Sequence, residues 1–246
     1  MTGISCQGSV IKGSPGPCCW DLGWNVHSMT VNPVEQVRED YDRIAGEYAR
    51  RMFHELEGKP KDRELLLRFA ALAGEGGAVC DMGCGPGHIA RFLRDSGVQR
   101  VSGLDLSPAM VEQARHLNPD IEFAEGNLLS LPLADGGLAG IAAFYAIVNI
   151  PEASLPVVFG EMLRVLRPSG ILLLTFHVGG EVLRPEELFG AKIATEFYHF
   201  DRTRIETLLE KAGFRIEDVV ERGPYGPEIE YQSRRAYVFA RKPPEG

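Results

Sequence analysis

The sequence predicts an α/β fold in which one sheet carries helices on both faces. Short apolar runs alternate with segments of helical periodicity along most of the 246 residues. A glycine-rich stretch, DMGCGPGHI at 81–89, follows the first apolar run and precedes a helical one. Sheets of this class bind ligands at the carboxyl ends of their strands. The pattern therefore predicts both an architecture and the edge of the sheet where a site lies.

Two helices are predicted ahead of the first strand. Apolar residues recur at intervals of three and four from Val34 to Tyr48, which places them on one helix face. A second helix is predicted from about Lys61 to Ala73, where Gly74 ends it.

Seven strands are predicted from the apolar runs. The runs lie near 78–82, 100–104, 120–124, 138–145, 170–177, 214–221 and 235–241. A helix over 152–166 is expected to end at an RPSG turn. A further helix is expected from Asp201 as N-cap to Gly213 as C-cap.

Composition narrows the class of protein. Hydrophobic residues make up 44% and charged residues 24%, which are globular values, and the net charge is −8. An acidic chain lacks the basic face of a nucleic-acid binder, and no apolar run reaches the roughly 18 residues of a membrane span. The five cysteines show no disulfide or metal-ligand spacing. We therefore expect a cytoplasmic monomer or homodimer without metal, nucleic acid or membrane partners.

The chain is expected to have three parts. Residues 1–28 show no periodicity and are interpreted as a disordered extension, or as translation begun upstream of a start at Met29. A redox or metal-binding tail is the alternative, although His27 and the cysteines match no ligand spacing. A covering helix is expected over 29–60 and the main domain over 61–242.

The glycine-rich stretch predicts a ligand-binding loop. An ordinary tight turn needs one glycine, whereas Gly83, Gly85 and Gly87 together allow a ligand to approach the backbone closely. The nicotinamide signature G-x-G-x-x-G fails because its third glycine would be His88, and no Walker lysine follows. Asp105 ends the second predicted strand and is placed to accept from the hydroxyls of a ribose. An adenosine-containing ligand without pyrophosphate fits these features.

Four segments resemble, in order and spacing, the motifs of class I S-adenosylmethionine-dependent methyltransferases. They read VCDMGCGPGHIARFL, VSGLDLSPAMVEQAR, FAEGNLLSLPLADG and EMLRVLRPSGILLLTF, and the similarity covers about 37–241. The stretch YDRIAGEYA resembles the helix that covers the cofactor in small-molecule members of the type 11/25-like branch. The resemblance implies a Rossmann-like, seven-stranded, mostly parallel sheet with helices on both faces. It also implies S-adenosylmethionine as cofactor and S-adenosylhomocysteine as product.

The resemblance implies a cofactor site position by position. Asp81 would hold the methionine ammonium directly or through water, and Asp105 the ribose hydroxyls. Many members have Asp where this chain has Asn127, whose amide oxygen accepts more weakly from the adenine amine. Cys84 is read as a spacer, with a nucleophile as the alternative. The complete set is Tyr48, Asp81, Gly83, Cys84, Gly85, Gly87, Asp105, Leu106, Met110, Asn127, Leu128, Phe144 and Tyr145.

The acceptor site is marked less clearly. In-line methyl transfer depends mainly on alignment, and a base is needed only when the acceptor must lose a proton. His177 and His199 are the catalytic candidates, with solvated loop histidines as the alternative. Acceptor contacts are expected from the first helix and from 178–200 and 222–231, acting as a lid. The candidate residues are Tyr41, Tyr198, Arg222 and Tyr225.

Three functions compete at this point. A methyltransferase acting on a small-molecule acceptor suits a compact, acidic chain. A protein or nucleic-acid methyltransferase is the first alternative, although the fourth strand lacks the NPPY or DPPY signature of adenine-modifying enzymes. A non-catalytic module that binds S-adenosylmethionine is the second alternative.

Overall fold

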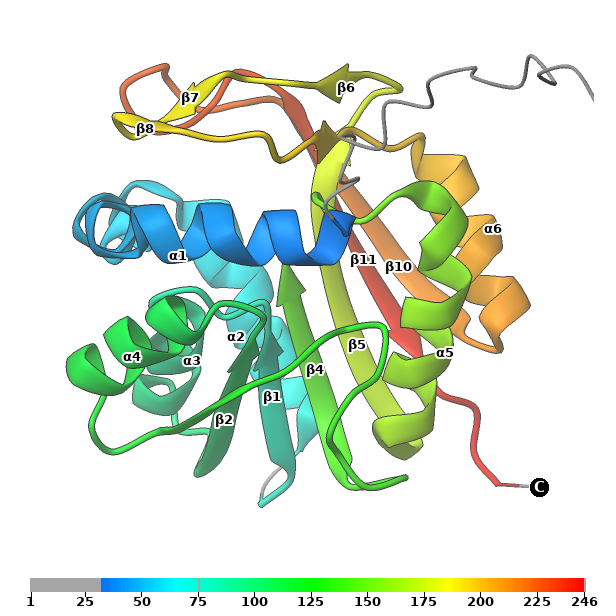
Figure 1. The fold of residues 1–246 in the computed structure, drawn as a ribbon. Coiled ribbons are helices and arrows are strands. Elements are labelled where there is room, and N and C mark those ends of the chain that lie inside the picture. The colour runs from blue at the N-terminus through cyan, green and yellow to red at the C-terminus, as the bar shows by residue number, and fades with distance from the viewer. Residues whose placement is uncertain (1–31, 75, 246) are drawn as a thin grey trace, which may run out of the picture. The chain divides into compact units, whose positions relative to one another are not determined.

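The computed structural model describes residues 32–74 and 76–245, which form one seven-stranded sheet with helices on both faces (Figure 1). The predicted extension 1–28 lies outside the described residues. In spatial order the strands are β10 (Arg215–Arg222), β11 (Arg234–Arg241), β5 (Leu166–Val178), β4 (Leu138–Phe144), β1 (Ala78–Met82), β2 (Arg100–Asp105) and β3 (Glu122–Glu125).

The strand order creates a crevice at one edge of the sheet. From β1 the chain continues outward through β2 and β3, and then returns to the other side of β1 with β4. Pairing is parallel from β5 through to β3, and β11 is antiparallel to both β5 and β10. Ligands bind where the strand order reverses, at the carboxyl ends of the strands. The predicted Rossmann-like, mostly parallel sheet is confirmed.

The helices begin and end largely where local signals place them. They are α1 (Pro33–Met52), α2 (Pro60–Ala73), α3 (His88–Asp95), α4 (Pro108–Leu117), α5 (Leu155–Val165) and α6 (Arg202–Ala212), with short 3₁₀ turns at Glu55–Gly58 and Glu152–Ser154. The Asp201 side chain accepts from the Arg204 N–H, and Gly213 adopts φ 107°. The predicted caps of α6 are therefore confirmed.

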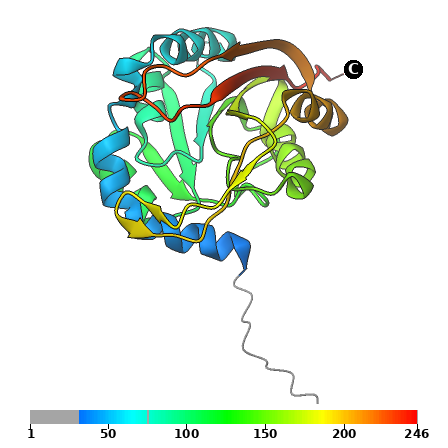
Figure 2. The same ribbon diagram turned by 90° about the horizontal axis from the view of Figure 1, so that it is seen from above.

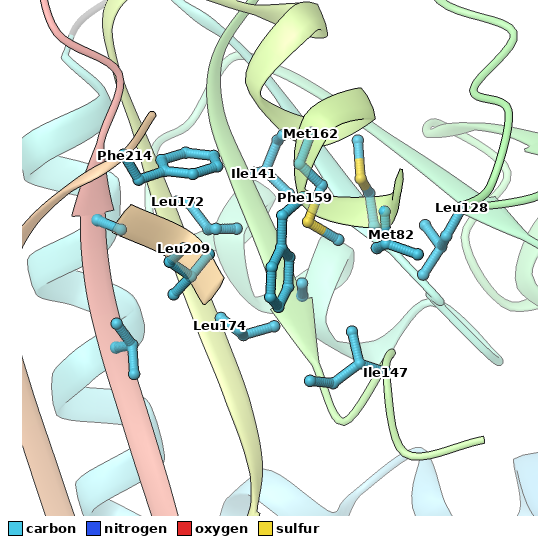
Figure 3. Close-up of a cluster of buried hydrophobic side chains, with 14 of the residues drawn as sticks. Met82, Leu128, Ile141, Ile147, Phe159, Met162, Leu172, Leu174, Leu209 and Phe214 are labelled. Carbon is cyan, nitrogen blue, oxygen red and sulfur yellow. The ribbon is translucent and has the colours of Figure 1, made fainter. Parts of the chain in front are cut away.

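Alternating residues of the central strands divide the core between the two faces. Ile141, Leu172 and Leu174 pack under α5 and α6, and Figure 3 shows them with Phe159 and Leu209. The intervening residues of the same strands face α2 and α3 on the other side. Both faces of the sheet are covered by buried apolar side chains, so its carboxyl edge provides a firm base for a site.

One turn prediction was wrong. The RPSG stretch at 167–170 was expected to separate helix from strand, but β5 begins at Leu166, directly after α5. Its pairing with β4 is irregular there, and Ser169 adopts φ 61°. The turn chemistry is present as a distortion within the strand.

The carboxyl edge is crossed by α1 and by the segment 178–200 (Figures 1 and 2). That segment was expected as a loop but contains two small antiparallel pairs. They are β6 (Val182–Leu183) with β9 (Phe197–Tyr198), and β7 (Glu187–Leu188) with β8 (Ala191–Lys192). No helix in the described ranges is long and apolar enough to cross a bilayer.

Candidate functional site

A cavity of about 970 Å³ lies at the carboxyl edge of the sheet. This volume is at the upper end of the range for ligand pockets, so it has room for two molecules of metabolite size. Most residues expected to form a site line it. They are Tyr41, Tyr48, Gly83, Cys84, Gly85, Asp105, Leu106, Met110, Asn127, Leu128, Phe144, Tyr145, His177 and His199.

The glycine loop forms one wall of the cavity because its backbone has no side chains to fill the space. Gly83, Gly85 and Gly87 all have positive φ, of 69°, 51° and 80°. A Cβ on Gly83 would lie 2.8 Å from the Ala146 Cβ, which is too close. A Cβ on Gly85 would face the Tyr48 ring, with its nearest atom 3.6 Å away. Gly85 therefore leaves its space to a ligand, whereas Gly83 permits close packing of the loop.

Asp105 stands at the end of β2 and joins the loop to the helix that follows. Its Oδ2 accepts from the Gly85 N–H at 2.8 Å, and its Oδ1 accepts from the Ser107 N–H at 2.9 Å. Burial raises the pKa of this carboxyl despite those bonds. Ser107 in turn caps α4 by accepting from the Met110 N–H. An acid fixed in this way beside a glycine cradle fits the ribose of an adenosine ligand.

Asp81 and Gly87, which were expected to contact the cofactor, do not line the cavity. The Asp81 side chain is 1% exposed and its Oδ2 accepts from the Ala90 N–H in α3. Burial raises its pKa to about 7. A Cβ on Gly87 would lie 2.7 Å from the Phe123 Cζ. In this structure Asp81 caps a helix from behind the loop, and Gly87 allows that helix to pack against β3.

Tyr41 and Tyr48 of α1 face the loop from across the cavity. Tyr48 packs edge-on against Tyr41 and Phe189, with ring centres 6.0 and 5.7 Å apart. The Tyr41 hydroxyl donates to the Asn149 Oδ1 at 2.9 Å. The rings therefore join α1 to the segment 178–200, and both also contribute to the wall.

Two further expected positions have local partners. Asn127 lines the cavity, and its Oδ1 accepts from the Leu129 N–H at 2.9 Å. The Cys84 thiol is 1% exposed and burial raises its pKa. A buried, protonated thiol is a poor nucleophile, which favours the spacer interpretation.

The two candidate histidines lie together beyond the ends of β4 and β5. His177 stacks on Tyr145 with ring centres 4.8 Å apart, and His199 lies 5.1 Å from His177. The His177 Nδ1 is 2.7 Å from the Ser233 Oγ, and the His199 Nδ1 is 3.4 Å from a carboxylate oxygen of Glu181. Burial and nearby cations lower the pKa of His177 to about 3. The His177 imidazole is therefore neutral.

Three expected acceptor residues point elsewhere. Tyr198, Arg222 and Tyr225 do not line the cavity. The Tyr198 hydroxyl is bonded to Glu196, and Arg222 makes two hydrogen bonds to Glu230. The Tyr225 ring stacks under the Arg222 guanidinium at 4.1 Å. All three side chains have partners outside the cavity, so the structure brings only Tyr41 of that set to it.

The sequence analysis missed a charged part of the cavity wall. It is formed by five residues and is here called the polar wall: Glu55, Lys59, His88, Glu230 and Arg235. The Glu55 Oε2 lies 2.5 Å from the Lys59 Nζ, and the Glu55 Oε1 lies 3.0 Å from the His88 Nε2. The Arg235 Nε lies 3.2 Å from the Glu230 Oε2, and both side chains are 2% exposed. One signal was available for Arg235, because it directly precedes the apolar run of β11 at the functional edge.

The comparisons agree with this geometry. A family model described as a methyltransferase domain matches residues 79–170. The chain is 34% identical over 156 residues to malonyl-[acyl-carrier protein] O-methyltransferase of Pectobacterium atrosepticum, covering 63% of this chain and 58% of that protein. It is 36% identical over 112 residues to demethylmenaquinone methyltransferase of Beutenbergia cavernae, covering 46% and 45%. Over residues 79–170 the chain is therefore similar to a class I methyltransferase domain.

Solved structures support the same fold for the methyltransferase domain. Magnesium protoporphyrin IX methyltransferase of Synechocystis, solved with bound S-adenosylmethionine, superposes with a TM-score of 0.65 over 86% of this chain and 98% of that one. Sequence identity is 17%, so this likeness concerns the fold. The curated relatives are matched over little more than half of their length or less, 58% and 45% for the two named above.

The described part of the methyltransferase domain holds no cluster of three or more His, Cys, Asp or Glu side chains arranged to bind a metal ion. The cavity instead combines a glycine cradle, an acid at the end of β2, and a polar wall near two histidines. Such an arrangement can hold a nucleoside and a second molecule side by side.

Proposed function

We propose that this protein is an S-adenosylmethionine-dependent methyltransferase that acts on a small-molecule acceptor. One observation carries the proposal: a single cavity has the Gly83–Gly85 loop and Asp105 on one wall and Tyr145 and His177 on another. A cofactor wall and an acceptor wall that share one cavity are what a transfer reaction requires.

The residues proposed to hold the cofactor surround the first of these walls. Asp105 would accept from the ribose hydroxyls, and Leu106 and Met110 would pack against the adenine. Asn127 and Leu128 would flank the adenine ring, and the glycine loop would receive the methionine part. When bound, the cofactor supplies a methyl group on a positively charged sulfur, which is a good leaving group. In this proposal Asp81 does not contact the cofactor; it caps α3 behind the glycine loop.

The task left to the protein is to align the acceptor and exclude water. In this proposal α1 and the segment 178–200 close the cavity above the strand ends. Tyr41 and Tyr48 contribute aromatic surface to that cover, which supports a dry site.

The histidines are proposed to act on the acceptor. A conjugate acid with a pKa near 3 makes His177 a weak base, so its proposed task is to position the acceptor through a hydrogen bond. His199, beside the Glu181 carboxylate, is the better placed base for an acceptor that carries a proton.

Two observations favour a small acceptor over a polymer. The net charge of −8 disfavours nucleic acid, and the cavity is covered by α1 and 178–200. The curated relatives are named for malonyl-[acyl-carrier protein] and demethylmenaquinone, which places quite different acceptors on related domains. The names of these relatives therefore do not decide the acceptor of this chain, which depends on the residues that line its own cavity.

Isothermal titration with S-adenosylmethionine and S-adenosylhomocysteine tests the first half of the proposal, and we expect both to bind. A methyl-transfer assay with labelled cofactor over panels of metabolites, peptides and RNA tests the second half. Labelling of metabolites is expected. Binding without any labelling would support a non-catalytic module, and labelling confined to peptides or RNA would support a macromolecular acceptor.

A further inference from the structure

Tyr145, the residue after β4, has an unusual backbone conformation and an unpaired hydroxyl. Its φ is 53°, a left-handed conformation that is strained for a non-glycine residue. Its N–H is held by Thr175, with the Oγ1 at 3.0 Å and the carbonyl oxygen at 3.2 Å. The Tyr145 Oη is buried and has no hydrogen-bond partner among the described residues. A strained residue that brings an unpaired donor to a cavity wall is explained if a ligand accepts that bond.

Arg235 lies beside Tyr145 and also has unused capacity. Its guanidinium carbon is 6.0 Å from the centre of the Tyr145 ring, and the residue is 2% exposed. The two terminal nitrogens donate to the carbonyls of Ser233 and Tyr231 at 2.7 and 2.8 Å. The Nε atom is near Glu230 but makes no hydrogen bond to any described residue. The Arg235 guanidinium is therefore held firmly at the cavity wall. It shares its charge with Glu230, and its Nε–H donor makes no hydrogen bond to the described residues.

Two basic side chains, Arg235 and Lys59, lie at the cavity wall beside Tyr145 and His177. Burial is the main cause that lowers the pKa of His177 to about 3, and the cations Arg235 and Lys59 lower it further, while Glu230 acts in the opposite direction. The part of this shift that comes from Arg235 and Lys59 is electrostatic, and their charges favour a negatively charged group nearby.

A further part of the cavity wall carries apolar side chains. It is formed by the first turns of α1 and by the segment 178–200, here called the apolar wall: Val34, Val37, Leu183, Pro185, Leu188 and Phe197. All six side chains are half-buried, so they present apolar surface that an apolar ligand would cover further.

We propose that the methyl acceptor is an amphiphilic carboxylic acid, bound as its carboxylate by Tyr145 and Arg235 with its apolar body along the apolar wall. The inference rests on the proposed function, since it names the acceptor of the same site. A carboxylate oxygen provides the electron pair for the new O–C bond, and the electron pair of the breaking C–S bond stays on sulfur. No proton has to leave, so a neutral His177 suffices to position the acceptor.

Three matched probes test this inference on the full chain saturated with S-adenosylhomocysteine. Decanoate, decanamide and decylamine share one apolar body and differ in the charge of the head group. Isothermal titration is expected to show decanoate binding at least about tenfold more tightly than either of the others, the scale of a hydrogen bond to a charged group. Equal or tighter binding of decanamide or decylamine, or binding of none of the three, would overturn the inference.

Variants locate the preference at the named residues. Tyr145→Phe removes only the unpaired hydroxyl and is expected to lower the decanoate-to-decanamide preference by about fivefold to tenfold. Arg235→Lys keeps the charge and should keep part of the preference, whereas Arg235→Gln should lose it. Decanamide binding by each variant serves as the control for folding. An undiminished preference in Tyr145→Phe would overturn the inference.

The two proposals fail differently. Absence of S-adenosylhomocysteine binding would overturn both the proposed function and this inference. Binding of S-adenosylhomocysteine without a carboxylate preference would overturn the inference alone.

Discussion

The Asp40 carboxylate on α1 accepts both the N–H and the hydroxyl of Thr195, at 2.9 and 2.8 Å. The Ala194 N–H reaches the same oxygen at 2.8 Å. Asp40 and Thr195 are 1% and 3% exposed, so these bonds are shielded from water. One buried carboxylate thus fixes the segment 178–200 to α1 above the cavity, and it holds two backbone donors that have no strand partner.

Asp40→Ala is expected to release that segment. The change leaves the N–H groups of Ala194 and Thr195 without their acceptor, and we expect unfolding to become easier by about 1–3 kcal/mol. Limited proteolysis should cut the variant within 182–194 faster than the wild type. Glu35→Ala is the matched control, because Glu35 pairs with Arg38 on the same helix and both side chains are 43% exposed. Equal cleavage of the Asp40 variant and the wild type would contradict this role.

Asp105→Ala is expected to weaken S-adenosylmethionine binding by about 1–3 kcal/mol, the range for hydrogen bonds to a charged group. The change also removes the acceptor of the Gly85 N–H, so the loop itself loses support. Isothermal titration measures the affinity, with thermal unfolding as a check on the fold. Asp120→Ala is the control, since Asp120 is half exposed and is bonded to Arg91 away from the cavity. Unchanged affinity in Asp105→Ala would remove it from the ribose role.

Gly85→Ala and Gly97→Ala separate the filling of the cavity from backbone strain. Both glycines have positive φ, 51° and 98°, so both substitutions should cost about 1 kcal/mol of stability. Only the Cβ on Gly85 enters the cavity; the one on Gly97 meets no atom within 4 Å. Cofactor affinity should therefore fall in Gly85→Ala and stay at the wild-type value in Gly97→Ala. Gly85→Val should abolish binding. A similar cofactor affinity in Gly85→Ala, Gly85→Val and Gly97→Ala would show that the glycine loop does not hold the cofactor.

Asp81 is expected to make stability depend on pH. Its pKa is raised to about 7, mainly by burial, so the folded protein retains a proton that the unfolded chain releases near pH 4. The contribution of protonated Asp81 to the free energy of unfolding is therefore complete below about pH 4. It is lost as the pH rises to about 7, and the loss amounts to a few kcal/mol. Denaturant unfolding should show that Asp81→Asn, which can still accept from the Ala90 N–H, loses less stability over that range than the wild type. Parallel pH profiles would mean that Asp81 titrates normally.

Local pattern predicted the strands and helices closely, because their signals lie within one segment. Ser107 and Asp201 cap the helices they were expected to cap, and each accepts an N–H three residues ahead. Asp105 ends its strand beside the glycine loop, as the spacing from Gly85 indicated. The RPSG stretch shows the limit of this approach. A turn signal predicts a bend, but pairing with β4 decides that the bend lies within a strand.

Most residues expected to hold the cofactor line the cavity, whereas of the expected acceptor residues only Tyr41 does. The cofactor motifs come from consecutive turns after neighbouring parallel strands, so order along the chain implies proximity. Arg235 comes from β11, whose antiparallel register places it opposite His177. Lys59 precedes α2 and reaches Glu230 at 3.7 Å across a separation in sequence that no local pattern reports.

The sequence by itself therefore determined the sheet, the caps, the glycine loop and the acid at the end of β2, since each depends on backbone geometry over a few residues. Only the tertiary structure decided that Asp81 caps a helix behind the loop and that Arg222 and Tyr225 turn toward each other. It also decided that Tyr145 brings to the cavity a hydroxyl that has no hydrogen-bond partner within 32–74 and 76–245. The direction and partners of a buried polar side chain depend on which distant groups share its space, and chain packing settles that.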